Sequence, residues 1–339
     1  MRQYRKIIIS RTDSIGDVVL TLPVAGLLRK YHPEARILFL GQSYTRAVIE
    51  SCIHIDEFID WNGLSALPAG RQAEFLRNTG ADLIIHVFPR REIALAAKKA
   101  GIPERMGTTG RLYHWYTCNR LVRLSRRNSP LHEAELNARL IARLLPGIAV
   151  TTSAIPALYG MERIKELPAG LRKLIDPERF NLILHPKSKG SGREWGIDNF
   201  AKLTELLPHE KYNIFITGTE AEGRLLEEAG FFGKARGVTN LTGKMDLEEL
   251  ISFISAAGGL VASGTGPLHL AAALGRVAIG LFPPIRPIHP GRWAPLGTRA
   301  TWLVAGKECN ECKNDTRCEC MLSIKPEEVK QKLESMVKP

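Results

Sequence analysis

The stretch KIIISRTDSIGDVVLTLP, residues 6–23, decides the fold class of the N-terminal part of the chain. Its three consecutive isoleucines, Ile7–Ile9, predict a buried strand, and the apolar residues from Val18 onward predict a helix. Gly16 lies where the strand gives way to the helix, without the G-x-G-x-x-G spacing of a dinucleotide-binding turn. The stretch therefore predicts the opening strand and helix of a parallel sheet, with Ser14 and Asp17 forming a capping box at the start of the helix.

The same alternation of short apolar strands and helices continues along the chain, which is typical of parallel α/β sheets. The predicted strands are Lys6–Ile9, Arg36–Leu40, Asp82–Val87, Asn181–His185, Asn213–Thr217, Gly259–Ala262 and Val277–Leu281. The predicted helices are Asp17–Tyr31, Arg71–Asn78, Asp198–Leu207, Ala221–Ala229, Leu247–Ala256, Gly266–Leu274 and Pro326–Met336. A segment rich in proline and charge near residues 155–180 separates two series of strands. We therefore expect two doubly wound domains that face a central cleft.

Length and composition agree with a two-domain globular protein. The chain has 339 residues, of which 44% are hydrophobic and 24% charged, and a length above about 300 residues exceeds what one core usually supports. No apolar run is long enough to span a membrane. The N-terminus lacks the long apolar region of a signal peptide. We expect a cytoplasmic protein.

Positive charge is concentrated in one window of the sequence. Of the net charge of +12, residues 89–127 carry +8, with Tyr113, Trp115 and Tyr116 among them. The basic residues of this window are Arg90, Arg91, Lys98, Lys99, Arg105, Arg111, Arg120, Arg123, Arg126 and Arg127. The window is either an ordinary solvated surface or a site for nucleic acid, an anionic membrane or a phosphorylated substrate. Charge by itself does not choose among these.

Two turns in the second half of the chain have the composition of phosphate-binding turns. The loop KSKGSGR, residues 187–193, offers backbone N–H groups and cationic side chains directly after a predicted strand. The turn SGTGP, residues 263–267, also follows a strand, and Pro267 suits the first turn of the helix that comes next. The N-terminus of such a helix favours an anion. Together the two turns predict a site for a nucleotide diphosphate.

Four ordered motifs resemble one known family. They are IGDVVLTLP near the N-terminus, an H-P-x(n)-R-x-W loop, LTGKMDLEELISFISAA and GTGPLHLAAALG, and the tail C-x2-C…C-x-C-M-x-x-I-x-P-E-E-V is similar as well. The chain resembles the heptosyltransferases, the family 9 glycosyltransferases of lipopolysaccharide core assembly. The resemblance implies the GT-B architecture of two Rossmann-like domains and an inverting, metal-independent sugar transfer from ADP-heptose. It implies an acceptor domain over residues 1–165, a nucleotide-sugar domain over 166–325 and a C-terminal helix over 326–339 that straps the domains.

The resemblance also assigns roles to individual residues. Asp17 matches the catalytic base, Gly16 would allow the acceptor to approach the backbone closely, and Arg193 matches the cation that neutralises the departing diphosphate. The positions that match donor contacts are Ser188, Glu222 (or its neighbour Glu220), Met245, Gly264, Thr265, Gly266 and His269. This sequence departs from the family at Gly264, where characterised members have an acidic residue that binds the heptose hydroxyls. We therefore expect either ADP-heptose or a different nucleotide sugar as the donor.

The basic window acquires a meaning from the same resemblance. The family's first domain receives a lipid-linked, phosphorylated saccharide at the cytoplasmic face of the inner membrane, so we assign Arg123, Arg126 and Arg127 to the acceptor side. Basic residues also suit the anionic surface of that membrane. Two alternatives remain at this level: a nucleic-acid-binding protein, although no recognition motif for nucleic acid is present and we expect no such partner, and a sugar-nucleotide epimerase.

Four of the six cysteines form a separate candidate site, the four-cysteine segment. Cys309, Cys312, Cys318 and Cys320 have the spacing C-x2-C-x5-C-x-C, and four thiols this close suit a structural, tetrahedral zinc ion. Disulfides would disagree with a reducing cytoplasm, and a thiol-rich loop with no ligand is the third alternative. We expect no cofactor to be required for catalysis.

Overall fold

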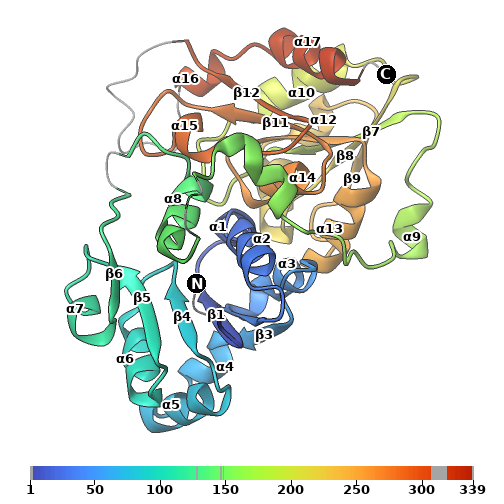
Figure 1. Cartoon of the computed structure of the whole chain (residues 1–339). Coiled ribbons are helices and arrows are strands. Elements are labelled where there is room, and N and C mark those ends of the chain that lie inside the picture. Colours follow the sequence, from blue (N-terminus) through green and yellow to red (C-terminus); the bar gives the residue numbers. More distant parts are fainter. Residues whose placement is uncertain (1–2, 127–128, 146, 148, 307–318, 338–339) are drawn as a thin grey trace. The chain divides into compact units, whose positions relative to one another are not determined.

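The computed structural model describes residues 3–126, 129–145, 147, 149–306 and 319–337. The chain divides into two compact units, Met1–Arg163 and Ile164–Pro339. Each unit contains one six-stranded sheet in which every pair of neighbouring strands is parallel (Figure 1). The doubly wound α/β fold predicted from the sequence is confirmed. The division falls two residues before the expected boundary.

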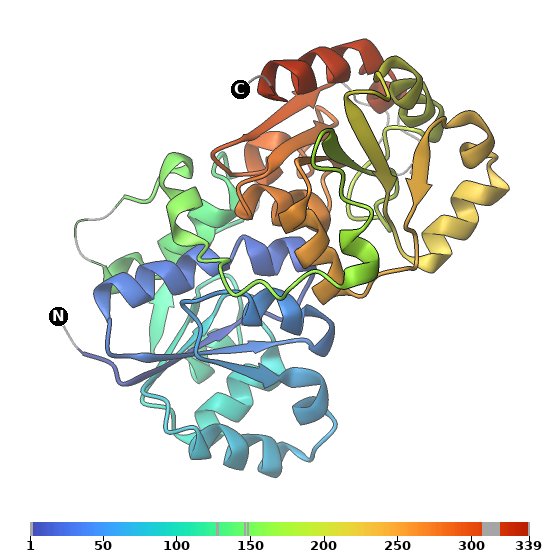
Figure 2. The same cartoon turned by 90° about the vertical axis from the view of Figure 1, so that its right-hand side faces the viewer.

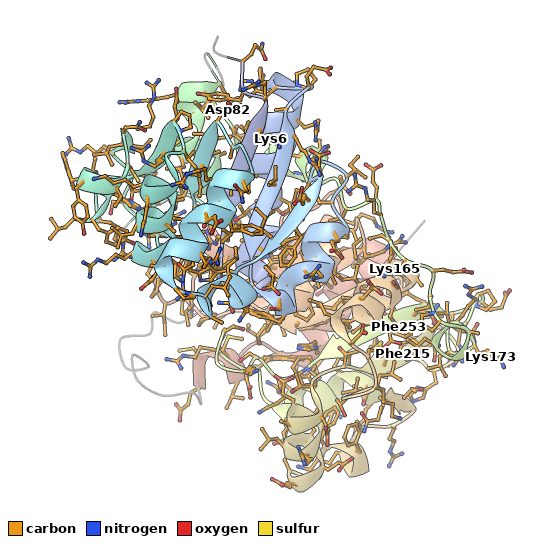
Figure 3. The ribbon with its side chains drawn as sticks, turned by 90° about the horizontal axis from the view of Figure 1, so that it is seen from below. Lys6, Asp82, Lys165, Lys173, Phe215 and Phe253 are labelled. Atoms are coloured by element: carbon orange, nitrogen blue, oxygen red, sulfur yellow. The ribbon has the colours of Figure 1, made fainter. Side chains whose placement is uncertain are left out.

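The first sheet has the strand order β3-β2-β1-β4-β5-β6. Its strands are β1 (Lys6–Ser10), β2 (Arg36–Gly41), β3 (Glu57–Asp60), β4 (Leu83–His86), β5 (Glu104–Thr108) and β6 (Arg120–Val122). The Asp82 carboxylate accepts hydrogen bonds from the backbone N–H groups of Arg5 and Lys6, at 2.6 and 3.0 Å, and so fixes the start of β1 beside β4 (Figure 3). The strand order reverses between β1 and β4, which makes their carboxyl ends the expected place for a ligand.

Helices cover both faces of this sheet (Figure 2). They are α1 (Ile15–Val19), α2 (Leu22–Tyr31), α3 (Arg46–Glu50), α4 (Trp61–Ser65), α5 (Ala69–Asn78), α6 (Arg91–Ala100), α7 (His114–Thr117) and α8 (Glu133–Leu140), with short 3-10 helices at Ser43–Thr45, Ala142–Leu144 and Thr152–Leu158. Leu76 of α5 and Ile93 of α6 join Ile8 and Leu38 of the sheet in one buried cluster, and α2 lies on the opposite face.

The helix predicted over Asp17–Tyr31 is in fact two helices, and that prediction was wrong. It breaks between α1 and α2 because Pro23 lies in the first turn of α2, where its missing N–H costs nothing. A single helix would need that N–H for its ladder of hydrogen bonds. Gly26 of α2 packs so closely on the 3-10 helix at Thr152–Leu158 that a Cβ atom there would lie 2.3 Å from the Leu158 carbonyl oxygen.

The second sheet repeats the same topology with the order β12-β11-β10-β7-β8-β9. Its strands are β7 (Phe180–His185), β8 (Tyr212–Ile216), β9 (Val238–Asn240), β10 (Gly259–Ser263), β11 (Val277–Phe282) and β12 (Ala300–Val304). Here the order reverses between β7 and β10. The two glycine-rich turns singled out in the sequence follow these two strands, so both lie at the switch point of this sheet.

The core of the second unit contains large aromatic residues on both faces of its sheet. Its helices are α9 (Ala169–Arg172), α10 (Ile197–Leu206), α11 (Glu220–Glu228), α12 (Phe231–Lys234), α13 (Leu247–Ala256), α14 (Gly266–Ala273), α15 (Pro290–Trp293), α16 (Glu319–Leu322) and α17 (Pro326–Val337). On one face, α17 packs against α10 and β11, and the buried Trp195 donates its indole N–H to the Ile324 carbonyl oxygen at 2.8 Å. On the other, the rings of Phe215 and Phe253 meet edge to face at 4.9 Å (Figure 3). No helix within the described ranges is long and apolar enough to cross a membrane.

Candidate active site

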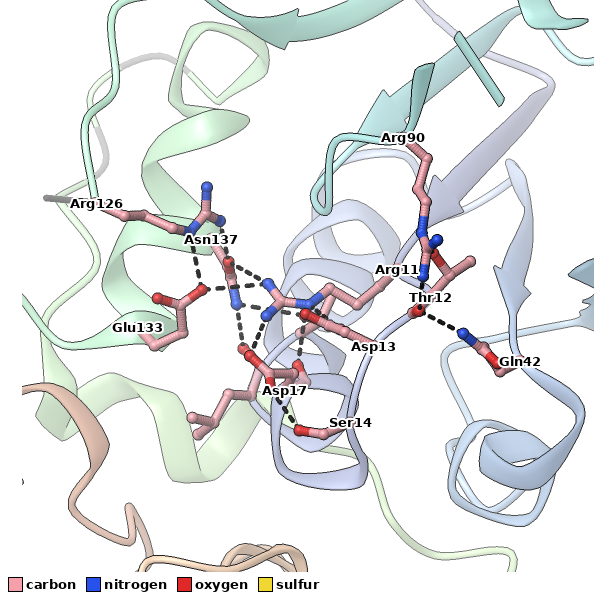
Figure 4. A network of polar contacts seen from close by, with 12 residues as sticks. Arg11, Thr12, Asp13, Ser14, Asp17, Gln42, Arg90, Arg126, Glu133 and Asn137 are labelled. Atoms are coloured by element: carbon pink, nitrogen blue, oxygen red, sulfur yellow. Dashed lines mark hydrogen bonds and ion pairs between the residues drawn. The ribbon is translucent and has the colours of Figure 1, made fainter. Parts of the chain in front are cut away.

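Asp17 lies in the first turn of α1, directly after the loop that leaves β1. Its carboxylate contacts the guanidinium of Arg11 through one oxygen and accepts a hydrogen bond from the Ser14 hydroxyl through the other (Figure 4). The Asp17 side chain is 18% exposed, whereas that of Arg11 is 3% exposed. Two neighbours therefore fix the carboxylate while leaving part of it accessible. The predicted capping box is wrong in detail, because Ser14 is the N-cap residue but its side chain bonds the Asp17 carboxylate rather than a backbone amide.

Arg11 is the centre of a buried polar network that the sequence did not reveal. Its Nε donates to Asp13 at 2.7 Å, and its Nη1 donates to Glu133 and Asn137 of α8 at 3.2 and 3.3 Å. A second guanidinium, Arg126, donates to the same Glu133 at 2.9 Å and the same Asn137 at 2.8 Å (Figure 4). Glu133 and Asn137 of α8 thus position Arg11, and Arg11 in turn contacts the Asp17 carboxylate. Glu133 lies 122 residues from Arg11 along the chain, and no local pattern marks it.

The network contains three carboxylates and two guanidinium groups. Burial raises the pKa of Asp13 to about 6, although the adjacent Arg11 opposes the rise. Burial lowers the pKa of Arg11, but the carboxylates of Asp13, Asp17 and Glu133 outweigh this effect and raise it above the ordinary arginine value. Arg11 therefore stays charged, and Asp13 changes its charge at a higher pH than an ordinary aspartate does.

The loop that carries these groups is fixed by the segments that follow the neighbouring strands. After β4, Arg90 donates to the hydroxyl and the carbonyl oxygen of Thr12, at 3.1 and 3.3 Å. After β2, Gln42 donates to the same carbonyl at 2.8 Å, and the Tyr44 hydroxyl donates to the carbonyl of Asp13 at 2.6 Å. Figure 4 shows Arg90 and Gln42 reaching Thr12. The site is thus built at the carboxyl ends of three adjacent strands.

The basic window is not one continuous surface of unpaired charge. Arg126 belongs to the buried network, Arg120 pairs with Glu104 at 3.1 Å, and Arg105 donates to the backbone carbonyl of Thr117 at 2.6 Å. Arg123 is exposed, and Arg127 lies outside the described residues. Of the three arginines assigned to an acceptor, the structure brings Arg126 alone into the site around Asp17 among those it describes.

The two predicted phosphate turns lie against each other in the second unit. A Cβ atom on Gly192 would lie 2.9 Å from the carbonyl oxygen of Gly264, and the Ser191 hydroxyl donates to that oxygen at 3.4 Å. Backbone approaches this close require glycine in the first turn. The two turns from which the sequence predicted a diphosphate site therefore touch each other, and binding of a diphosphate there stays a prediction.

The first of these turns is organised internally. Lys189 and Gly190 have positive φ angles of 48° and 80°, and the Ser188 hydroxyl donates to the carbonyl of Gly192 at 2.8 Å. Ser188 is thus occupied within the loop. Glu194, which the sequence did not single out, accepts from the Ser188 backbone N–H at 3.2 Å and pairs with Lys187 at 2.6 Å. Arg193 is half-buried and lies in the chain between Gly192 and Glu194, both of which make these hydrogen bonds.

The second turn presents hydroxyl groups at a helix N-terminus. Ser263 and Thr265 are 1% and 4% exposed, and neither hydroxyl has a hydrogen-bond partner among the residues that the structure describes. Thr265 is the N-cap residue of α14, yet its side chain does not cap the helix. Pro267 lies in the first turn, as predicted. Buried hydroxyls beside first-turn N–H groups are suited to bind the oxygen atoms of an anion. His269 is buried one turn further along α14.

Packing explains why residue 264 is a glycine. A Cβ atom there would lie 2.9 Å from Cε1 of Phe282, a ring that is 1% exposed in the core of the second unit. Any side chain at this position would require the ring to move. The acidic residue expected from the family therefore does not fit the present core.

The remaining predicted donor residues lie at helix starts. Glu222 accepts from the backbone N–H of Thr219 at 2.8 Å as part of the capping box of α11, whereas the side chain of Glu220 is 77% exposed. Met245 is half-buried and directly precedes Asp246, the N-cap residue of α13. Glu222 thus has a structural task, and its role toward a ribose stays a prediction.

Only one cysteine of the four-cysteine segment lies within the residues that the structure describes. Cys309, Cys312 and Cys318 lie outside the described residues, and Cys320 is buried in α16. Among the residues that are described, no group of three or more His, Cys, Asp or Glu side chains could hold a metal ion. Zinc binding by this segment therefore stays a prediction.

Comparison with known proteins gives the class of enzyme to which this protein belongs. Residues 156–322 match the family model of glycosyltransferase family 9 (heptosyltransferase). This part of the chain is a family 9 glycosyltransferase domain. The protein is a glycosyltransferase that resembles the heptosyltransferases of lipopolysaccharide biosynthesis. Asp17 and its network lie before the matched residues.

Relatives and solved structures extend the similarity over nearly the whole chain. Lipopolysaccharide heptosyltransferase 2 of Escherichia coli is 25% identical over 298 residues, which cover 83% of this chain and 84% of that protein. The glycosyltransferase of family 9 from Veillonella parvula superposes with a TM-score of 0.81 at 18% identity, covering 99% of this chain and 98% of that one. The E. coli heptosyltransferase WaaC, solved with ADP, has a TM-score of 0.71 at 18% identity, covering 98% and 100% of the two chains. These structures share the GT-B fold.

Proposed function

We propose that this glycosyltransferase moves a sugar, heptose from ADP-heptose, onto a lipopolysaccharide core or a related lipid-linked saccharide with inversion at the anomeric carbon. The observation that carries the proposal is the pair of turns at the β7–β10 switch point. There the loop of residues 187–193 touches the turn of residues 263–266 through Gly192 and Gly264, beside two buried hydroxyls that lack partners among the described residues.

The donor diphosphate is proposed to bind across these two turns. Ser263 and Thr265 would donate hydroxyl hydrogens to its oxygens, and the first-turn N–H groups of α14, including that of Gly266, add the favourable end of the helix dipole. Arg193 would neutralise the charge that grows on the diphosphate as the bond to the sugar breaks. This chemistry needs no metal ion, since cationic and N–H groups take its place.

Asp17 is proposed as the general base. An acceptor hydroxyl must lose its proton as its oxygen attacks the anomeric carbon from the face opposite the departing diphosphate, and a partly exposed carboxylate is suited to accept that proton. Arg11 and Ser14 hold the two carboxylate oxygens in one orientation. The role of Arg11 is therefore to position Asp17. Gly16 is buried in α1 next to Asp17, and the absence of a side chain there would allow the acceptor to approach the backbone closely.

The nucleotide base and the sugar of the donor are proposed from what similar proteins are named for. WaaC is described with ADP, and Met245 with Glu222 or Glu220 would contact the adenosine. The relative named heptosyltransferase 2 supports a heptose. Because Phe282 closes the space around Gly264, the sugar must be read by other residues, and a nucleotide sugar other than ADP-heptose is the alternative. The acceptor side would include Arg123 and Arg127, next to an anionic membrane surface on its cytoplasmic face.

Two measurements test this proposal. ADP and ADP-heptose should raise the melting temperature with increasing concentration, whereas UDP and GDP should not, because a ligand that binds only the native state stabilises it. Asp17→Asn should leave the ADP response unchanged and lower turnover roughly 10²- to 10⁴-fold, whereas Arg193→Ala should impair both. An Asp17→Asn enzyme with near-normal turnover would refute the mechanism, and conversion of the nucleotide sugar without acceptor would favour an epimerase.

A further inference from the structure

One surface of the first unit combines exposed apolar side chains with positive charge. It is formed by α6, the turn of residues 110–113 and α7, which pack on one another at the β6 edge of the sheet (Figure 1). We name it the α6–α7 surface. Its members are Arg91, Leu95, Lys98, Lys99, Arg111, Leu112, Trp115 and Tyr116. None of them belongs to the site around Asp17.

The exposed positions of α6 form a single helical face. Residues 91, 92, 95, 98 and 99 are exposed, whereas residues 93, 94, 96, 97 and 100 are buried, which is the spacing of one side of an α-helix. Lys98 of this face lies 6.0 Å from the centre of the Tyr116 ring. The contact joins the exposed face of α6 to that of α7, so their side chains belong to one continuous surface.

The apolar members of this surface are unusually accessible. Leu112 is 87% exposed, Trp115 61%, Tyr116 50% and Leu95 40%. The indole N–H of Trp115 donates to the Thr109 carbonyl oxygen at 3.0 Å, so the polar atom of the side chain is satisfied while its ring remains in contact with water. A cluster of this kind is more typical of an interaction site than of an ordinary surface.

The charge around the apolar cluster is almost all positive. Arg91, Lys98, Lys99 and Arg111 are exposed, and Glu92 is the acidic side chain of the same helical face. Trp and Tyr rings flanked by Lys and Arg are the composition of surfaces that enter the interface of a lipid bilayer. A second copy of the chain would bring like charges together, and nucleic acid would leave the exposed leucines without an apolar partner.

We propose that the α6–α7 surface docks on an anionic lipid bilayer, with Leu112, Trp115 and Tyr116 in the interfacial layer and the basic side chains on the lipid phosphates. The inference deepens the proposed function in that a lipid-linked acceptor lies at such a surface. It does not depend on which residue is the base or which sugar is moved. Arg126, which the sequence analysis assigned to the acceptor side, does not belong to this surface, because it pairs with the buried Glu133.

The test is sedimentation of the full chain with vesicles of phosphatidylglycerol and phosphatidylcholine, compared with vesicles of phosphatidylcholine alone. Each basic residue near an anionic surface adds about 1 kcal/mol, which is about five-fold in the partition coefficient. Lys98→Glu/Arg111→Glu should therefore weaken binding about 25-fold or more. Leu112→Ser/Trp115→Ser should weaken it about 10-fold or more, because the exposed apolar area can no longer enter the bilayer. Added salt should weaken binding of the unmutated protein.

Matched controls separate docking from unfolding and from catalysis. Leu67→Ser/Phe75→Ser removes two other exposed apolar residues of the first unit, and Lys173→Glu/Lys211→Glu reverses two exposed lysines of the second. Both should bind vesicles like the unmutated protein, and all four variants should keep their stabilisation by ADP. Equal binding to uncharged vesicles, or unchanged binding of both α6–α7 variants, would overturn the inference. So would a dimer or an RNA complex that these variants abolish. If ADP does not raise the melting temperature of the unmutated protein, that result would instead count against the proposed function.

Discussion

The buried position of Asp13 makes the stability of this protein depend on pH in an unusual direction. Most carboxylates in folded proteins have a lowered pKa and stabilise the fold as pH rises. The carboxylate of Asp13 is 20% exposed and shares Arg11 with two other carboxylates, and burial raises its pKa from 3.8 to about 6. Asp13→Asn keeps the shape and a hydrogen-bond acceptor but removes the titration.

The sign and size of the effect follow from proton linkage. As pH rises from about 4 to about 6 the unfolded chain releases this proton before the folded protein does, so the folded state binds more protons and loses stability. Full titration between a pKa of 3.8 and one of about 6 corresponds to roughly 3 kcal/mol at 1.36 kcal/mol per pKa unit. The stability of Asp13→Asn relative to the unmutated protein should therefore increase by roughly 2–3 kcal/mol from near pH 4 to above pH 7.

Urea unfolding of both proteins over this pH range measures the difference, and taking the variant minus the unmutated protein removes the contribution of every other titrating group. Asp176→Asn is the control of opposite sign. A hydrogen bond from Arg179 lowers the pKa of Asp176, so the stability contributed by Asp176 is present at high pH and is lost as pH falls. A difference for Asp13→Asn that is constant with pH would refute the reasoning. A difference that decreases with rising pH would mean that attraction to Arg11 outweighs burial.

Three further predictions concern other parts of the chain. Gly264→Asp should destabilise the protein by about 1–3 kcal/mol, because its side chain collides with a buried ring, and it should not improve the use of ADP-heptose in a transfer assay. Arg126→Ala should cost about 2 kcal/mol of stability, since it leaves a buried carboxylate with one cation fewer, whereas Arg123→Ala should change the free energy of unfolding by less than about 0.5 kcal/mol. If the four-cysteine segment holds zinc, protein purified without added metal should contain about one zinc per chain, and chelation should lower the melting temperature while transfer persists below it.

Each of these predictions has an outcome that contradicts it. Unchanged stability of Gly264→Asp would show that the core of the second unit yields more easily than its packing indicates. Equal effects at positions 123 and 126 would mean that the contacts of Arg126 with Glu133 and Asn137 contribute nothing measurable to stability. Protein that is free of metal and indifferent to chelators would leave the four-cysteine segment without its proposed ligand.

The sequence by itself determined the features that rest on local chemistry. Runs such as Ile7–Ile9 and Leu182–Leu184 could be predicted as buried strands because short, continuous apolar runs are typical of parallel sheets that are covered on both faces. Leu247–Ala256 was predicted to the residue, since Asp246 and Glu249 form a capping box at its start. The turn of residues 263–267 could be recognised because glycine and proline have fixed positions at a helix N-terminus. Strands such as Val238–Asn240 were missed, since three half-buried residues at a sheet edge carry no periodic pattern.

Only the tertiary structure decided how distant residues combine. Arg11, Glu133 and Arg126 form one network because β1 and α8 meet in space, and nothing in the segment around Glu133 records that meeting. The fit of Gly264 against Phe282 depends likewise on two strands becoming neighbours, β10 and β11. The exposed cluster around Leu112 and Trp115 could be separated from the buried part of the basic window only when burial was known. The free energies of helix caps, turns and strand formation depend mainly on residues that are close together in the chain, so the sequence alone can predict these features. The free energies of ion pairs, burial and close packing depend on residues that are far apart in the chain and become neighbours only in the folded protein.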